Sequence, residues 1–172
     1  DQLDWIAGTL LQAGITSWRL FRIFPIGRAA TNPDLCLDPT STRKMLDWIA
    51  QKRPIYAKQG LDISFSCEGY LPFTLDRKVR TEPYFCRSGI NFASILCDGS
   101  ITGCNNNSTK LIQGNILKDD FATVWQNRFE AFRDRTWLHT GQCSDCKEWK
   151  YCQGGSLHLR EPGDNGPAFC YL

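Results

Sequence analysis

The chain has 172 residues, of which 42% are hydrophobic and 22% are charged. This composition is typical of globular proteins and excludes a disordered chain or a coiled coil. Twenty basic and eighteen acidic residues give a net charge of +2, which supplies no broad positive field, so we expect no nucleic-acid partner. No apolar stretch reaches the ~20 residues that a membrane span needs, so we predict no membrane span.

The first residues and the cysteine content bear on location and cofactor. The chain opens on Asp1 without a methionine, a basic segment or an apolar segment of a secretory signal, so we expect a cytoplasmic protein and interpret the sequence as a segment of a longer one. It contains nine cysteines. Because a chain of this length can bury a sufficient core without disulfides, metal binding is the leading explanation for them.

Two segments near the start have the patterns of a helix and a strand. Apolar residues recur at helical spacing over residues 3–11, and Gly14 follows where a C-terminal glycine would end the helix. Residues 18–24 are rich in aromatic and aliphatic residues on both faces, which is typical of a strand covered on both sides in a parallel sheet.

A second helix and strand follow. Asp38 or Thr40 can cap a helix that Pro54 ends or kinks. Residues 61–65 alternate as the next strand. Repeated helix and strand units predict an α/β fold with a parallel sheet and right-handed crossovers.

The pattern changes after about residue 66. Residues 67–85 contain prolines, a glycine and mixed charges, and are predicted to form a linker. Asp119 or Asp120 can open a helix in the second half of the chain. Cys36 and Cys67 are isolated, and we interpret both as small buried hydrophobes.

Residues 94–102 have the signal of a β-hairpin. Asp98-Gly99 suits a two-residue type I′ turn between two short strands. In that register Cys97 lies on a strand, and we interpret it as a core thiol. Cys86 is then the better partner for Cys104.

Four cysteines near the end have the spacing of a metal or cluster site. Cys143 and Cys146 form a C-x2-C pair, which places two thiolates on one side of a loop. Cys152 and Cys170 can complete the shell around one metal ion or one iron–sulfur cluster. The alternatives are structural cysteines or disulfides.

At these positions the sequence resembles the SPASM domain, the cysteine-rich C-terminal extension of many radical S-adenosylmethionine (radical SAM) enzymes. Twelve residues separate Cys86 from Gly99 and four separate Gly99 from Cys104, as in the first half of the family pattern. The second half, C-x2-C-x5-C followed by a last cysteine, is matched by Cys143, Cys146, Cys152 and Cys170.

The resemblance implies a two-part architecture. Residues 1–75 would be the C-terminal strand and helix units of a radical SAM partial (β/α) barrel, and residues 76–172 a small α+β SPASM domain with a β-hairpin and Cys-rich loops. The hairpin and residues 154–160 are most similar to peptide-modifying or lipoprotein-associated members. These imply radical modification of a peptide or protein substrate.

The resemblance also implies cofactors and a redox partner. The outer 4Fe-4S cluster of the family corresponds to the four cysteines near the end. The inner one would retain only Cys86 and Cys104, because Ser156 stands where the family has a cysteine. It would be absent, or completed by Ser156, His158 or a non-protein ligand. S-adenosylmethionine would bind the full-length enzyme, and a flavodoxin or ferredoxin would be the reductant.

The catalytic cluster motif of radical SAM enzymes, C-x3-C-x2-C, does not occur in the sequence. We therefore expect that this segment alone cannot hold the iron that cleaves the cofactor, and we assign no catalytic residue. Arg19, Arg22 and Arg28 could face the inside of a barrel, but they receive no role.

Two other classes of protein remain as alternatives. Four thiolates also suit a tetrahedral zinc ion, so the chain could be a non-enzymatic zinc-binding module. A secreted disulfide protein is disfavoured, because nine cysteines leave one without a partner and no signal segment is visible.

Overall fold

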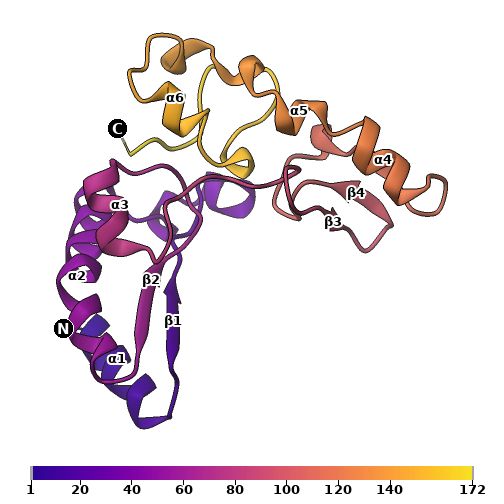
Figure 1. Cartoon of the computed structure of the whole chain (residues 1–172). Coiled ribbons are helices and arrows are strands. Elements are labelled where there is room, and N and C mark those ends of the chain that lie inside the picture. Colours follow the sequence, from indigo (N-terminus) through magenta and orange to yellow (C-terminus); the bar gives the residue numbers. More distant parts are fainter. Residues whose placement is uncertain (1, 172) are drawn as a thin grey trace. The chain divides into compact units, whose positions relative to one another are not determined.

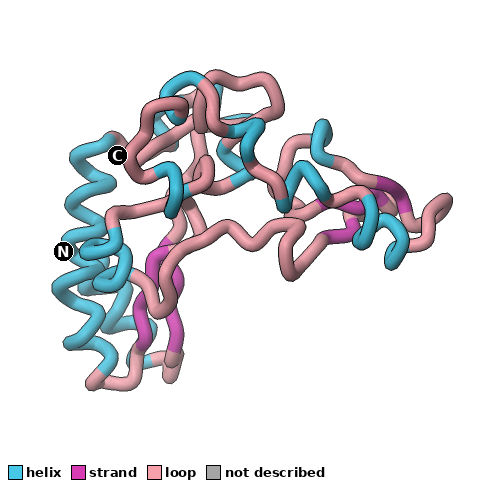
Figure 2. The backbone as a smooth tube through the Cα atoms, turned by 45° about the horizontal axis from the view of Figure 1, so that its top comes forward, coloured by secondary structure: helices cyan, strands magenta, loops and turns pink. Residues whose placement is uncertain are grey.

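The computed structural model describes residues 2–171, and the chain divides into two compact units (Figure 1). Unit 1 comprises residues 2–84 together with Tyr171, and unit 2 comprises Phe85–Cys170. Helices and strands occur in both (Figure 2), which confirms a mixed helix and sheet fold. The assignment of unit 1 to a partial barrel stays a prediction.

Unit 1 consists of helices packed on a short parallel sheet. Strands β1 and β2 pair in parallel, as the sequence predicts, and the register places Ser17 opposite Asp62 and Leu20 opposite Phe65. Helix α2 packs against β2 and against α3. The elements are α1 (Gln2–Gln12), β1 (Ser17–Leu20), the 3-10 turns η1 (Gly27–Thr31) and η2 (Pro33–Leu35), α2 (Pro39–Ala57), β2 (Asp62–Phe65) and α3 (Phe73–Val79).

Helix α2 begins where the sequence predicts. The Asp38 carboxylate accepts a hydrogen bond from the Ser41 backbone N–H at 2.9 Å, which satisfies one of the donors that a helix start leaves open. Pro54 lies inside the helix, which continues to Ala57, so Pro54 does not end the helix, and the alternative that it kinks the helix stays a prediction.

The core of unit 1 explains why these elements hold together. Apolar side chains from both strands and all three helices are buried against one another, and together they are Ala7, Leu20, Met45, Leu46, Ile49, Leu61, Ile63, Phe65, Leu71 and Val79. Burying a side chain of this size contributes about 1.5–3 kcal/mol, so this set is the main source of stability for unit 1.

The predicted strand over residues 18–24 is too long. Strand β1 ends at Leu20, and Phe21 and Ile23 beyond it are 60% and 49% exposed. The backbone N–H of Arg22 donates to the Glu68 carboxylate instead of joining a strand ladder. Strand β1 therefore ends before the apolar segment that predicted it, which continues to residue 24.

The predicted linker over residues 67–85 is also wrong. It contains α3, which starts after Pro72, and Val79 at its end is fully buried. Proline is tolerated at a helix start, because the N–H groups of the first turn have no intrahelical acceptor and the N–H that proline lacks therefore costs no hydrogen bond. The prolines that indicated a linker are therefore compatible with a helix boundary.

Unit 2 is built from short elements. Strands β3, β4 and β5 form an antiparallel sheet in that order. The elements are β3 (Ser94–Ile95), β4 (Ser100–Thr102), η3 (Thr109–Leu111), β5 (Gly114–Asn115), α4 (Phe121–Asn127), α5 (Glu130–Arg133), η4 (Thr136–Leu138), η5 (Gly141–Cys143), α6 (Trp149–Cys152) and η6 (Leu157–Leu159). Their buried side chains are Ile101, Leu111, Val124, Phe129, Phe132, Leu138 and Leu157.

The hairpin exists, but its register differs by one residue from the prediction. Ile95 lies opposite Ile101, and the Gly99 N–H donates to the Leu96 carbonyl at 2.9 Å. The loop therefore has three residues, with Gly99 in the left-handed region at φ 83°, as in a type I turn followed by a bulge. Cys97 falls in this loop and is exposed, so its interpretation as a core thiol is wrong.

Helix α4 starts where the sequence predicts. Asp120 accepts a hydrogen bond from the Thr123 N–H at 2.8 Å. Phe129 and Phe132 follow the end of this helix and are fully buried.

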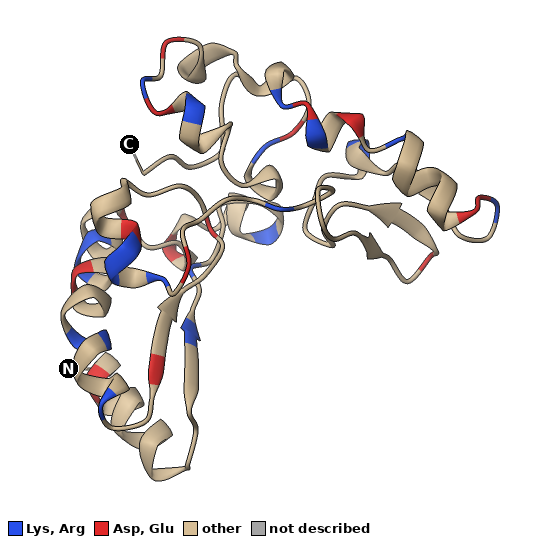
Figure 3. Ribbon diagram, in the orientation of Figure 1, with Lys and Arg blue, Asp and Glu red and all other residues tan. Residues whose placement is uncertain are grey.

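The distribution of charged residues and the lengths of the helices bear on possible partners. Basic and acidic residues are interspersed along both units (Figure 3). None of the helices within residues 2–171 combines the length and the apolar character that crossing a bilayer requires.

Candidate metal centre

The C-x2-C pair lies on a hydrogen-bonded turn in unit 2. The Cys143 N–H donates to the Thr140 carbonyl at 3.0 Å, and the Cys146 N–H donates to the Cys143 carbonyl at 3.4 Å. The Trp149 N–H then donates to the Cys146 carbonyl at 3.1 Å and leads into α6, whose last residue is Cys152. One continuous series of turns thus carries three of the predicted ligands.

A close backbone approach requires Gly141 before this turn. Its φ is 54°, and a Cβ atom at this position would lie 1.9 Å from the Asn165 carbonyl oxygen. The same oxygen accepts a hydrogen bond from the Gln142 N–H at 3.1 Å. Any other residue at position 141 would push the 165 segment away from the turn.

The return of the chain brings Cys170 back to the other ligands. The Ala168 N–H donates to the Leu159 carbonyl at 2.6 Å, two residues before Cys170. The 165–168 segment is therefore attached at both of its ends, to Gln142 and to Leu159. This attachment joins a ligand that is distant in sequence to the turn.

The four thiols interact electrostatically. Burial raises the pKa of the Cys152 thiol to about 12, and negative charge on Cys170, Cys143 and Cys146 raises it as well. These four thiols are therefore coupled electrostatically within unit 2. Within residues 2–171, however, no three Cys, His, Asp or Glu side chains converge closely enough to hold a single metal ion.

A buried arginine contacts the site. The side chain of Arg160, which is 3% exposed, donates from Nη1 to the Cys143 sulfur at 3.3 Å. Its Nη2 donates to the Thr140 hydroxyl at 3.0 Å. The sequence analysis assigned Arg160 no role, and the only signal was a basic residue in the glycine-rich segment after Cys152.

The residues predicted for an inner site are not joined. Cys86 is half-buried against the core of unit 2, and its carbonyl accepts a hydrogen bond from Arg135. The Cys104 sulfur lies 3.4 Å from the Asn105 side-chain oxygen. Among residues 2–171, no hydrogen bond or ion pair connects Cys86 with Cys104.

The other proposed contributors to an inner site lie on η6. Ser156 precedes this turn and is buried. His158 is also buried, and this burial lowers the pKa of its imidazole to about 4. A second cluster site therefore stays a prediction.

The remaining cysteines do not form pairs. No disulfide joins any two cysteines of residues 2–171. Cys36 is half-buried, whereas Cys67 is exposed, so the interpretation of Cys67 as a buried hydrophobe is wrong.

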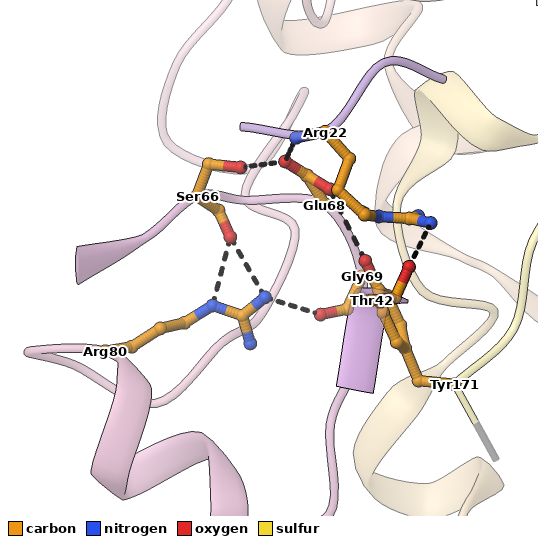
Figure 4. A network of polar contacts seen from close by, with 7 residues as sticks. All are labelled: Arg22, Thr42, Ser66, Glu68, Gly69, Arg80 and Tyr171. Carbon is orange, nitrogen blue, oxygen red and sulfur yellow. Dashed lines mark hydrogen bonds and ion pairs between the residues drawn. The ribbon is translucent and has the colours of Figure 1, made fainter. Parts of the chain in front are cut away.

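Unit 1 contains a polar network that the sequence analysis missed (Figure 4). Arg22 follows β1 and Glu68 follows β2, so both lie at the carboxyl ends of parallel strands. The Arg22 Nε donates to a Glu68 oxygen at 3.0 Å, and both side chains are buried. The Ser66 hydroxyl donates to the other Glu68 oxygen at 2.7 Å.

Arg80 extends the network. Its guanidinium donates to the backbone carbonyls of Ser66 and Gly69, each at 2.9 Å from Nη2, and pairs with Asp76. Tyr171 packs under the Arg22 guanidinium, and burial raises the pKa of its hydroxyl above the usual range. These groups are used within unit 1, so they do not present an open cofactor site.

Comparison with known proteins finds a family match within unit 2. Residues 86–147 match the SPASM family, described as an iron–sulfur cluster-binding domain. This segment includes Cys86, Cys104, Cys143 and Cys146, whereas Cys152 and Cys170 lie beyond it.

One curated relative supports the wider resemblance. The chain is 22% identical over 157 residues to the AdoMet-dependent heme synthase of Nitratidesulfovibrio vulgaris (strain Hildenborough). The match covers 82% of this chain and 41% of that relative. No solved structure matches the chain. The two matches confirm the resemblance to the C-terminal part of a radical SAM enzyme with a SPASM domain.

Proposed function

We propose that the chain binds one auxiliary 4Fe-4S cluster and supports radical chemistry as part of a radical SAM/SPASM enzyme. The observation that carries this proposal is the continuous series of hydrogen-bonded turns that holds Cys143, Cys146 and Cys152 in the unit that contains the SPASM match. The proposed ligands are Cys143, Cys146, Cys152 and Cys170.

The donor set fits a cluster better than a single ion. Each iron of a 4Fe-4S cluster takes one thiolate, so the four sulfurs do not have to converge on one atom. A structural zinc ion needs all four sulfurs about 2.3 Å from one point. Cys143, Cys146 and Cys152 are half-buried and Cys170 is exposed, so three of the four proposed ligands are partly screened from water.

Such a cluster, when bound, transfers single electrons, and its potential depends on burial and on hydrogen bonds to the sulfurs. The chain's own residues would hold it and exclude water. The tight turn at Gly141 would position Cys143 and Cys146, and the attached 165–168 segment would position Cys170.

Anaerobic reconstitution of the chain with iron and sulfide tests the proposal. We expect nearer four than eight irons per chain, visible absorption of an iron–sulfur cluster, and loss of both in Cys146→Ala. Cys97→Ala is the matched control, because Cys97 is an exposed thiol of the same unit. A colourless chain that binds one zinc through the same cysteines would replace this proposal with the zinc-module alternative.

The number of clusters has its own test. Because Ser156 stands where the family has a cysteine, we expect Cys86 and Cys104 to hold no stable second cluster. Eight tightly bound irons that fall to four in Ser156→Ala or His158→Ala would contradict this expectation.

We propose that S-adenosylmethionine is used by the whole enzyme and not by this segment alone. The sequence has no C-x3-C-x2-C motif, so the reconstituted and reduced chain should release no 5′-deoxyadenosine. The reductant would be a protein of the flavodoxin or ferredoxin class. Release of 5′-deoxyadenosine that is abolished by Cys143→Ala would contradict the assignment of an auxiliary role.

The substrate has two candidates. The sequence motifs favour a peptide or protein, because the hairpin and residues 154–160 are most similar to peptide-modifying members. The match to a heme synthase favours a heme precursor instead. Titration of the reconstituted chain with an iron tetrapyrrole and with an unstructured peptide, followed by tryptophan fluorescence, would separate them. Saturable quenching by only one ligand identifies the class.

A further inference from the structure

Arg160 is a buried cation beside a predicted cluster ligand. Its Nη1 lies 3.3 Å from the Cys143 sulfur, and its Nη2 donates to Thr140 Oγ1 at 3.0 Å and lies 3.5 Å from the Asp164 carbonyl oxygen. The side chain is 3% exposed. An arginine stays protonated in proteins, so its charge must be balanced inside unit 2.

No carboxylate supplies that balance. Arg160 forms no ion pair with an acidic side chain in the described part of the chain. The Asp164 carboxylate accepts the Glu161 N–H at 2.9 Å instead, and the Glu161 carboxylate pairs with Lys110 at 3.1 Å. The ionisable group in hydrogen-bond contact with the guanidinium is therefore the sulfur of Cys143.

The Nε–H of Arg160 is a second indication. This atom is buried and makes no hydrogen bond within residues 2–171. A buried donor without an acceptor is destabilising. A cluster held by four thiolates is an anion, and an anion beside Arg160 would both balance its charge and accept from it.

We infer that Arg160 is a positioning residue that donates a charge-assisted hydrogen bond to the Cys143 sulfur and raises the reduction potential of the auxiliary cluster. This inference rests on the proposed function of the four cysteines. Reduction adds negative charge to the cluster, and a nearby cation stabilises the reduced state more than the oxidised state. The hydrogen bond to sulfur acts in the same direction.

The test compares variants of the full chain after anaerobic reconstitution. Arg160→Gln removes the charge, whereas Arg160→Lys keeps it. Arg133→Gln is the control, because Arg133 also donates to backbone carbonyls of unit 2 but contacts no thiol. Iron content and a redox titration followed by electron paramagnetic resonance are measured for each chain.

We expect Arg160→Gln to keep its iron and to shift the midpoint potential down. At a fixed potential the ratio of oxidised to reduced cluster should rise at least about tenfold, which is 59 mV for a one-electron couple. Arg160→Lys should recover at least half of the shift, and Arg133→Gln should match the unmodified chain.

Three outcomes would overturn the inference. They are an unchanged potential in an iron-loaded Arg160→Gln chain, an equal shift in Arg133→Gln, and loss of iron in both Arg160 variants, which would assign Arg160 a structural role only. If Arg160→Gln alone loses its iron, the measurement passes to Arg160→Lys, which keeps the charge. A midpoint potential of Arg160→Lys shifted by more than about 59 mV would then overturn the inference, and a smaller shift would support it. An unmodified chain that binds no cluster would instead contradict the proposed function.

Discussion

The two units achieve order by different means. In unit 1, helices of up to 19 residues pack on a parallel strand pair, and the core contains side chains from every helix and strand. In unit 2 the longest helix has 7 residues, and many connections are 3-10 turns. The core of unit 1 connects all of these elements, whereas residues 141–170 of unit 2 form only short turns and one four-residue helix.

The two units also differ in how their buried charged side chains are paired. Unit 1 neutralises its buried charges within itself, since Arg22 pairs with Glu68 and Arg80 with Asp76. Unit 2 buries Arg160 beside a thiol and no carboxylate. Unit 1 thus pairs its buried carboxylates and guanidinium groups with one another, whereas the buried Arg160 of unit 2 has a sulfur beside it.

Removing iron should give the largest difference between the units. In Cys146→Ala we expect residues 141–170 to lose hydrogen-exchange protection, while residues 2–84 keep it, because ligand binding and folding are coupled at such sites. Exchange measured by mass spectrometry, before and after chelation of the unmodified chain, checks this. Equal protection of residues 141–170 with and without iron would show that this part of unit 2 does not need a cluster to be ordered.

Breaking the buried Arg22–Glu68 ion pair should destabilise unit 1 and leave the iron content of unit 2 unchanged. Glu68→Gln leaves the Arg22 charge buried and uncompensated, which should cost about 3–5 kcal/mol in the unfolding of unit 1 without changing iron content. Arg43→Gln, at the exposed Arg43–Asp47 pair, is the control and should cost less than about 1 kcal/mol. Urea titration measures both, and similar costs for the two variants would contradict the role of the network.

His158 should make the stability of unit 2 depend on pH. Burial lowers its pKa to about 4, whereas the unfolded imidazole takes up a proton near pH 6.5. Between these values only the unfolded state gains the proton, so stability should be complete above about pH 6.5 and fall towards pH 4, by at most about 1.4 kcal/mol per pH unit. Thermal unfolding of the iron-free chain and of His158→Gln measures this slope, which should be smaller in the variant.

Asp4 should have the smallest effect, and it belongs to unit 1. Hydrogen bonds from Lys52 and Trp48 hold the pKa of its carboxyl well below the usual range. Its contribution should be present above the unfolded value near 3.8 and be lost as the pH falls below it. In Asp4→Asn, the stability of unit 1 should fall less steeply as the pH is lowered into the acid range. An unchanged pH dependence would show that this surface contact does not contribute to the stability of unit 1.

Local signals were sufficient for much of the fold. Asp38 and Asp120 cap helices as expected, because a cap depends on residues three positions apart. The spacing of Cys143, Cys146 and Cys152 places them on one series of turns for the same reason. These features depend on neighbours in sequence, which is why a sequence alone can predict them.

Tertiary contacts decided the rest. The hairpin register moved by one residue because Gly99 adopted a bulge, and this moved Cys97 from a strand to an exposed loop. Arg22 contacts Glu68, which lies 46 positions away in the sequence, and β1 ends two residues before this contact. Cys170 and Arg160 reach the Cys143 turn through backbone and side-chain contacts between segments that the sequence keeps apart. The sequence by itself determined which residues could serve as ligands, and only long-range packing, which no local pattern encodes, decided which of them meet and which charge lies beside them.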